Sequence, residues 1–278
     1  MEIKDIIKES LVFPSNNLDK LAIYVVMLFV LGLVTAGGII SIIFALFDSS
    51  IFLLLAGVFF LISIALALWI KGYEVSIMRA GIEFEDDAPS FYWKKDIVIG
   101  IKMLILSIVY FIIPAMSVVI IALITNVPGN LIGLIPDIGG IFTNPTAIAN
   151  STVPAVSAAS HPSLSALGGS ILITAILGAI IFVVFAFIQT MGEARLANTG
   201  SLSEALDIPE AAADIGRIGY GKVLAVVLIV VVILAAIEAI LGAIYGHVPQ
   251  LSIISIVLTP YLVFFAKYAY GLMYLDIA

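Results

Sequence analysis

Residues 21–47 read LAIYVVMLFVLGLVTAGGIISIIFALF, an apolar stretch that contains no charged side chain. A helix of about 20 apolar residues crosses the roughly 30 Å hydrocarbon core of a bilayer. The stretch is longer than the apolar core of a signal peptide, which has about 7–15 residues. It therefore predicts a membrane-spanning helix rather than a cleavable leader.

Five more apolar stretches of comparable length follow along the chain. They run from about 51 to 70, 97 to 125, 169 to 190, 223 to 245 and 251 to 275. Lipid cannot satisfy an open backbone, and the alternating pattern of a membrane barrel strand is absent. We predict an all-α integral membrane bundle of six transmembrane helices, forming a single domain over residues 1–278, with short interfacial helices.

The overall composition supports a membrane protein and excludes several classes of function. The 278 residues are 63% hydrophobic and 11% charged, with a net charge of −7 and no cysteine, whereas soluble domains are about 45–50% apolar and about 25% charged. A soluble enzyme, a disordered chain and a nucleic-acid-binding protein are therefore excluded. The lack of cysteine removes disulfides, thiolate zinc sites and iron–sulfur clusters. We expect no cofactor, because no Walker A or dinucleotide-binding pattern occurs, and we expect no metal site.

The positive charges predict the orientation of the spans. All Lys and Arg residues precede the first span, follow the second or fourth, or lie near the inner ends of the third and sixth: Lys4, Lys8, Lys20, Lys71, Arg79, Lys94, Lys95, Lys102, Arg195, Arg217, Lys222 and Lys267. Loops on the cytoplasmic side carry the excess of Lys and Arg. We therefore expect a multi-pass protein of the cell (plasma) membrane with both termini in the cytoplasm.

Short helices are predicted on the cytoplasmic side. Residues 2–11 place Ile and Leu on one helical face and charged side chains on the other, and Pro14 should end this helix. Such a helix fits the membrane interface, although it could also dock a partner. Ser201 and Asp207 each begin a capping-box pattern that predicts a further short helix.

The outer segment 126–168 contains no Lys or Arg and is long for a structureless loop. Because parts of it are apolar, we expect it to fold in part into short helices. Asn150 begins an Asn-Ser-Thr glycosylation acceptor pattern on the predicted outer side.

Glu238 is the one carboxylate deep within a predicted span, which makes it a candidate functional residue. Small residues recur beside it at helical spacing, so we expect this face to meet another helix. Ser255 and Thr259 lie on one stripe of the next span at matching depth. Two interpretations follow: a protonated Glu238 hydrogen-bonded to these hydroxyls, or a relay for cations or protons.

Four further charged residues lie near the predicted inner leaflet: Lys102, Lys267, Glu74 and Glu193. Lysine side chains can reach the interface from such depths, so we expect the two lysines to extend toward water. Pairing with Glu193 or Glu74 is the alternative.

Several motifs are shared with a known family. They are Ser10-Leu-Val-Phe-Pro14 with Asp19, Gly72-Tyr73 with Arg79, Pro89-Ser-Phe-Tyr-Trp93, Gly100-Ile-Lys102, Tyr110-Phe-Ile-Ile-Pro114, Ala194-Arg-Leu-Ala-Asn-Thr-Gly-Ser-Leu-Ser-Glu-Ala-Leu206 and Asp214-Ile-Gly-Arg-Ile-Gly219. On these motifs the chain resembles the archaeal integral membrane family known as domain of unknown function 4013. The resemblance covers nearly the whole chain and implies no activity for any residue.

The sequence leads to two hypotheses about function. The first is a non-enzymatic scaffold or membrane-organising protein that contacts the lipid bilayer and forms a homo-oligomer or binds other membrane proteins. The alternative is a small transporter or channel with an intramembrane site at Glu238, between helices five and six. An intramembrane enzyme is the least supported class, because it would need a cluster of His, Asp or Glu at matched depth.

Overall fold

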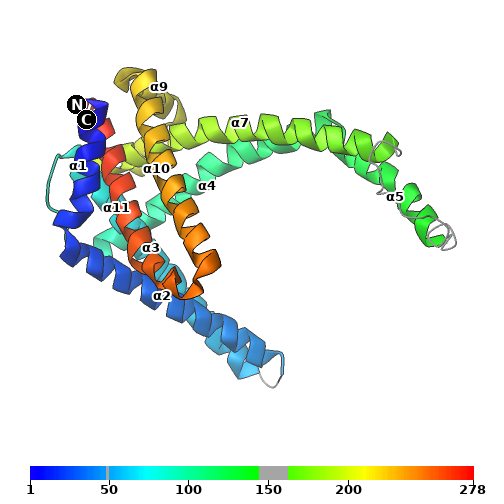
Figure 1. The fold of residues 1–278 in the computed structure, drawn as a ribbon, viewed down its shortest axis with the longest axis horizontal. Helices are drawn as coiled ribbons and strands as arrows, with labels where there is room; N and C mark the ends of the chain where they lie inside the picture. Colours follow the sequence, from blue (N-terminus) through cyan, green and yellow to red (C-terminus); the bar gives the residue numbers. More distant parts are fainter. Residues whose placement is uncertain (48–49, 144–161) are drawn as a thin grey trace. The chain divides into compact units, whose positions relative to one another are not determined.

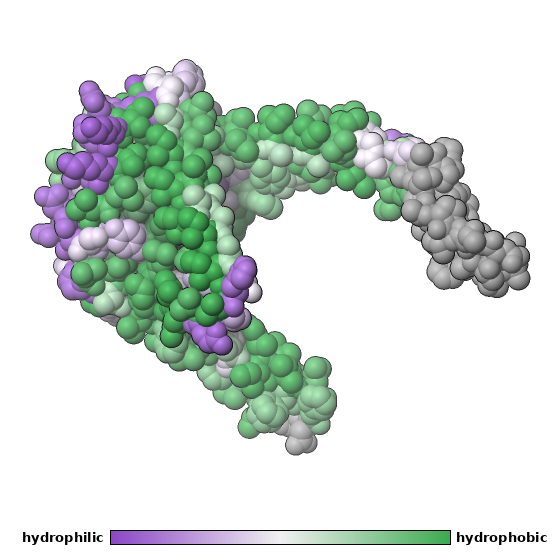
Figure 2. Space-filling view, in the orientation of Figure 1, coloured by the Kyte–Doolittle hydropathy of each residue, from purple (hydrophilic) through white to green (hydrophobic). Residues whose placement is uncertain are grey.

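The computed structural model describes residues 1–47, 50–143 and 162–278, without the side chains of residues 136–143 and 162–163. Within these residues all regular structure is helical, and six helices are long and apolar enough to cross a membrane. The prediction of an all-α protein with six membrane-spanning helices is confirmed. Figure 2 shows apolar residues over most of the visible described surface, with hydrophilic residues near α1 and the chain ends and a second group near the junction of α10 and α11.

Figure 1 shows the described helices in chain order. They are α1 (Ile3–Asn16), α2 (Leu18–Ala45), α3 (Ser50–Ile82), α4 (Trp93–Ile124), α5 (Val127–Thr143), α7 (Pro162–Thr199), α8 (Leu202–Ala205), α9 (Ile208–Ile218), α10 (Tyr220–His247), the 3₁₀ helix η2 (Pro249–Ile254) and α11 (Ser255–Tyr274). The six candidate spans are α2, α3, α4, α7, α10, and η2 continued by α11.

The observed helices extend beyond several predicted spans. We expected the second span to end near Ile70, yet α3 continues to Ile82. Charged side chains between these positions suggested a loop, but most of this last part of α3 is buried. Likewise α7 begins at Pro162, seven residues before the predicted start of the fourth span.

The chain divides into two compact units, which we describe separately. The first unit contains residues 1–107 and 187–278, and the second contains residues 108–186. The two chain ends both belong to the first unit and lie side by side in Figure 1, where the amino group of Met1 is 2.9 Å from Asp276 Oδ1.

Glycines allow two close helix crossings in the first unit. A Cβ atom on Gly81 or Gly271 would collide with the backbone of the other helix, so α3 and α11 touch backbone to backbone. A Cβ on Gly72 or Gly100 would collide in the same way where α3 meets α4. Small residues permit such close approach between membrane helices. These crossings fix which faces of α4 and α11 lie against α3.

Helix α1 packs against protein through its apolar face. Ile6 and Ser10 are fully buried, and the ring of Phe13 stacks on Tyr268 of α11 with a centroid distance of 3.8 Å. The prediction that Pro14 ends the helix was wrong, because α1 continues to Asn16. Packing of Phe13 holds the last turn despite the hydrogen bond that proline cannot make.

Both predicted helix starts are present, at α8 and α9, each with the N-cap bond of its capping box. Ser201 Oγ accepts a hydrogen bond from the backbone N–H of Glu204, and Asp207 Oδ1 accepts one from Glu210. Asp214 on α9 is almost fully buried and pairs with Arg195 at 2.9 Å. The segment between α7 and α10 is therefore tied to the end of α7.

In the second unit, part of the predicted outer segment is helical. Residues 127–143 form α5, and Asn130 Nδ2 donates a hydrogen bond to Ser170 Oγ of α7 at 3.2 Å. The expectation of helices within this segment is thus met where the structure describes it. Asn150 lies outside the described residues.

Candidate functional site

An ion pair lies on α3 where the helix continues past its predicted end. Lys71 Nζ is 3.0 Å and 2.9 Å from the two carboxylate oxygens of Glu74, one helical turn away. The hydroxyl of Tyr24 on α2 donates a hydrogen bond to Glu74 Oε1 at 2.9 Å. The Glu74 side chain is 6% exposed, whereas that of Lys71 is 59% exposed. The carboxylate is therefore enclosed and neutralised, while the ammonium group faces open space.

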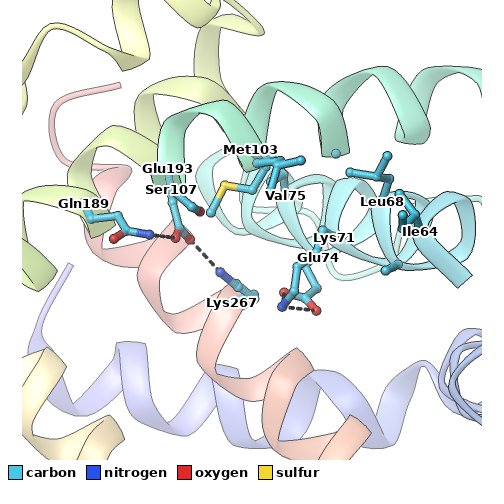
Figure 3. Close-up of a pocket in the computed structure, with 13 residues that line it drawn as sticks. Ile64, Leu68, Lys71, Glu74, Val75, Met103, Ser107, Gln189, Glu193 and Lys267 are labelled. Atoms are coloured by element: carbon cyan, nitrogen blue, oxygen red, sulfur yellow. Dashed lines mark hydrogen bonds and ion pairs between the residues drawn. The ribbon is translucent and has the colours of Figure 1, made fainter. Parts of the chain in front are cut away.

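A second ion pair connects α7 to α11 (Figure 3). Lys267 Nζ is 2.6 Å from Glu193 Oε2. Gln189, one turn before Glu193 on α7, donates to the other carboxylate oxygen at 3.3 Å. The side chains of Lys267 and Glu193 are 18% and 11% exposed. Both oxygens of Glu193 thus accept hydrogen bonds from protein.

The two ion pairs line one cavity of about 580 Å³, which we call the first cavity. Figure 3 shows Ile64 and Leu68 of α3 at one end, and Gln189 and Glu193 at the other. The remaining lining residues come from α3 and α4: Ala67, Val75, Gly100, Met103, Leu104 and Ser107. The first cavity is therefore apolar at one end and charged at the other.

A second cavity of about 390 Å³ lies between α3, α10 and α11. Lys71, Glu74 and Lys267 line this cavity as well as the first, so these three side chains form a shared wall. Glu238 lines only the second of the two. The other lining residues are Leu234, Thr259, Leu262, Val263 and Ala266. The second cavity therefore brings three acidic or basic residues of the shared wall together with Glu238.

The predicted trio of Glu238, Ser255 and Thr259 is brought together only in part. Glu238 is exposed and shares the second cavity with Thr259. In the part of the chain that the structure describes, Glu238 has no hydrogen bond or ion pair. Ser255 Oγ instead donates to the Ser252 carbonyl at 2.6 Å. The proposed hydrogen-bonded link between Glu238 and these hydroxyls is absent from the described contacts.

The other predicted inner-leaflet lysine binds a helix end. Lys102 Nζ donates to the carbonyl of Gly200 at 2.7 Å, and Arg79 Nε donates to the carbonyl of Ala197. Carbonyls at a helix C-terminus lack partners within the helix and carry partial negative charge. Lys102 and Arg79 therefore satisfy the end of α7. For Lys267, the structure shows the pairing alternative, with Glu193.

Sequence reasoning missed three members of the site. Lys71 and Gln189 each lie one turn from a predicted acid, and this spacing on a helix could have indicated them. Tyr24 offered no such signal, because it lies within an apolar span 50 residues before Glu74.

Charged groups outside the spans hold the cytoplasmic elements together. Burial raises the pKa of Asp276, but hydrogen bonds from Lys222 and the N-terminal amine outweigh it and leave the pKa below its ordinary value. Hydrogen bonds to Asp214 and Glu210 raise the pKa of Arg217. These contacts stabilise the positions of α9, α10 and the chain ends.

Comparison with family models gives a match. The model of a family described as "Protein of unknown function (DUF4013)" matches residues 55–246, more than half of the chain. No curated protein and no solved structure matches. The matched range contains Lys71, Glu74, Glu193 and Glu238.

Proposed function

Since the chain belongs to the DUF4013 family, whose description assigns no activity, we propose from the cavities themselves that it is a small transporter or channel. In this proposal it catalyses no covalent reaction. Its site is the second cavity, where Glu238 binds the transported cation or proton.

The observation that carries the proposal is that Glu238, a carboxyl side chain within a span, has no hydrogen bond or ion pair among the described residues. Two lysines and two glutamates of the cavities form two ion pairs, Lys71–Glu74 and Lys267–Glu193. Glu238 makes no such pair among the described residues, yet it opens into a cavity of about 390 Å³. Ionisable residues within membrane spans are costly and mark ion pathways and proton relays. A cation or proton entering the cavity would supply the missing positive charge.

The test is flux into liposomes that contain the purified protein. The wild type should carry protons or monovalent cations down a gradient, and Glu238→Gln should abolish this flux, because an amide cannot take up and release a proton. Glu83→Gln, a change of an exposed carboxylate in the loop after α3, is the matched control and should retain full flux. Absence of flux in the wild type under every gradient would refute transport.

A second candidate function is a homo-oligomeric scaffold, which a different observation favours. Ala235, Ala239, Gly242 and Gly246 of α10 are exposed, and a Cβ on either glycine would meet no atom within 4 Å. Such a small-residue face allows close approach of a helix from a second copy. Cross-linking in vesicles should then trap a dimer in the wild type and lose it in Gly242→Leu.

We further propose that both chain ends lie in the cytoplasm and that the protein resides in the plasma membrane. The contact between Met1 and Asp276 supports a common side for the two ends. The distribution of Lys and Arg supports the cytoplasmic side.

A further inference from the structure

We infer that the first cavity binds one phospholipid molecule, with its phosphate at Lys71 and a hydrocarbon chain along α3 and α4. This inference concerns the first cavity, does not depend on transport through the second, and begins from the donors that the two ion pairs leave free.

The ammonium groups at the charged end keep N–H donors that the two ion pairs do not use. Both carboxylate oxygens of Glu74 and of Glu193 already accept hydrogen bonds from protein groups. An ammonium group carries three N–H donors. Among the described residues, Lys267 uses one acceptor and Lys71 uses only the oxygens of Glu74. A ligand with acceptor oxygens can therefore bind the remaining N–H donors of Lys71.

Lys71 is the better placed of the two ammonium groups. Its side chain is 59% exposed, compared with 18% for Lys267. The four charges of the cavity sum to zero, because two lysines face two glutamates. A phosphate diester offers two acceptor oxygens and one negative charge, which suit the exposed ammonium group of Lys71 rather than the cavity as a whole.

The opposite end of the first cavity suits a hydrocarbon chain that enters from the bilayer. Ile64 is 55% exposed and Leu104 is 48% exposed. Their exposure opens the apolar end to the surface that lipid covers in a membrane. A cavity of about 580 Å³ falls within the range of ligand sites, roughly 300–1,000 Å³. A bilayer lipid satisfies both ends, whereas a free anion satisfies only one.

Native mass spectrometry of the delipidated full-length protein tests the inference. The probes are dioleoylphosphatidylglycerol, dioleoylglycerol, which lacks the phosphate, and inorganic phosphate, which lacks the chain. We expect one saturable phosphatidylglycerol per chain. We expect binding at least fivefold weaker for each of the other two probes.

Two variants and a control locate the site. Lys71→Met should weaken phosphatidylglycerol binding about fivefold, the effect of one basic residue on an anionic lipid. Lys95→Met removes an exposed lysine that does not line the cavity and should bind as the wild type does. Ala67→Phe keeps every charge, fills the apolar end and should also weaken binding, which covers the case that Lys71→Met fails to fold.

Three results would overturn the inference. They are equal affinity for phosphatidylglycerol and dioleoylglycerol, equal affinity for inorganic phosphate and the lipid, or wild-type binding by Ala67→Phe.

Discussion

Replacing Lys267 by Met would leave Glu193 enclosed without its ammonium partner. Removal of one member of a buried ion pair costs about 3–5 kcal/mol, because the remaining charge stays desolvated. Here the two side chains keep 18% and 11% exposure, and Gln189 still donates to Glu193. Water reaches the pair through the cavity and screens the remaining charge, which reduces this cost. We therefore expect Lys267→Met to destabilise the protein by about 2 kcal/mol, less than a fully buried pair would cost.

The double variant separates loss of the pair from loss of packing. Glu193→Gln removes the stranded charge but keeps the side-chain shape, so Lys267→Met with Glu193→Gln should recover most of the lost stability. The free energy of unfolding in SDS, measured from bicelles, gives each value. Lys95→Met serves as the control for a lysine that is exposed.

A specific result would refute this reasoning. If the double variant is as unstable as the sum of the two single variants, the residues do not interact. Packing alone would then hold Lys267 in the shared wall.

Four further predictions concern two glycines, the Asp276 carboxylate and the orientation of the chain. Gly271→Ala should destabilise the protein by about 1–3 kcal/mol, because its methyl group would collide with the Met78 carbonyl. Gly57→Ala, where a Cβ meets nothing within 4 Å, should be neutral or stabilising in the same unfolding assay. The lowered pKa of Asp276 means that its contribution is present above its ordinary pKa of about 3.9 and is lost as pH falls through the lower folded value. The stability difference between the wild type and Asp276→Asn should therefore shrink below about pH 4, and a constant difference down to pH 2 would contradict the assignment. For orientation, a cysteine at position 150 should react with an impermeant reagent in intact cells and one at position 86 should not; the reverse pattern would place the termini outside.

Hydropathy predicted the helices of this fold because a spanning helix must be apolar over its whole length. Because apolar residues occupy all sides of a spanning helix, hydropathy does not indicate which face packs against neighbouring helices. Hydrophobic residues surround Glu238 on every side of α10, so the sequence could suggest a partner but not choose one. The structure places it beside the wall of Lys71, Glu74 and Lys267 instead of giving it a bond to Ser255.

At the end of α3 we predicted a loop after Ile70, but the structure continues as a helix to Ile82. Lys71, Glu74 and Arg79 suggested a cytoplasmic loop because isolated charges end a hydropathic segment. Each of them finds a partner from a distant or neighbouring position, namely Glu74 for Lys71, Tyr24 for Glu74 and the Ala197 carbonyl for Arg79. Contacts between residues 50 or more positions apart depend on the three-dimensional packing, which a single sequence does not reveal.

The crossing of α3 and α11 at Gly81 and Gly271 has a mechanical consequence. Two backbones in direct contact have no side chains interlocked between them, so the angle between the helices can change there without repacking side chains. Lys71 lies ten residues from Gly81, about 15 Å along the helix. A rotation of about 10° at this pivot would therefore displace Lys71 by roughly 2.6 Å, close to the length of a hydrogen bond. Small changes of angle at the glycines would thus be enough to exchange the partners of an ammonium group at the cavities.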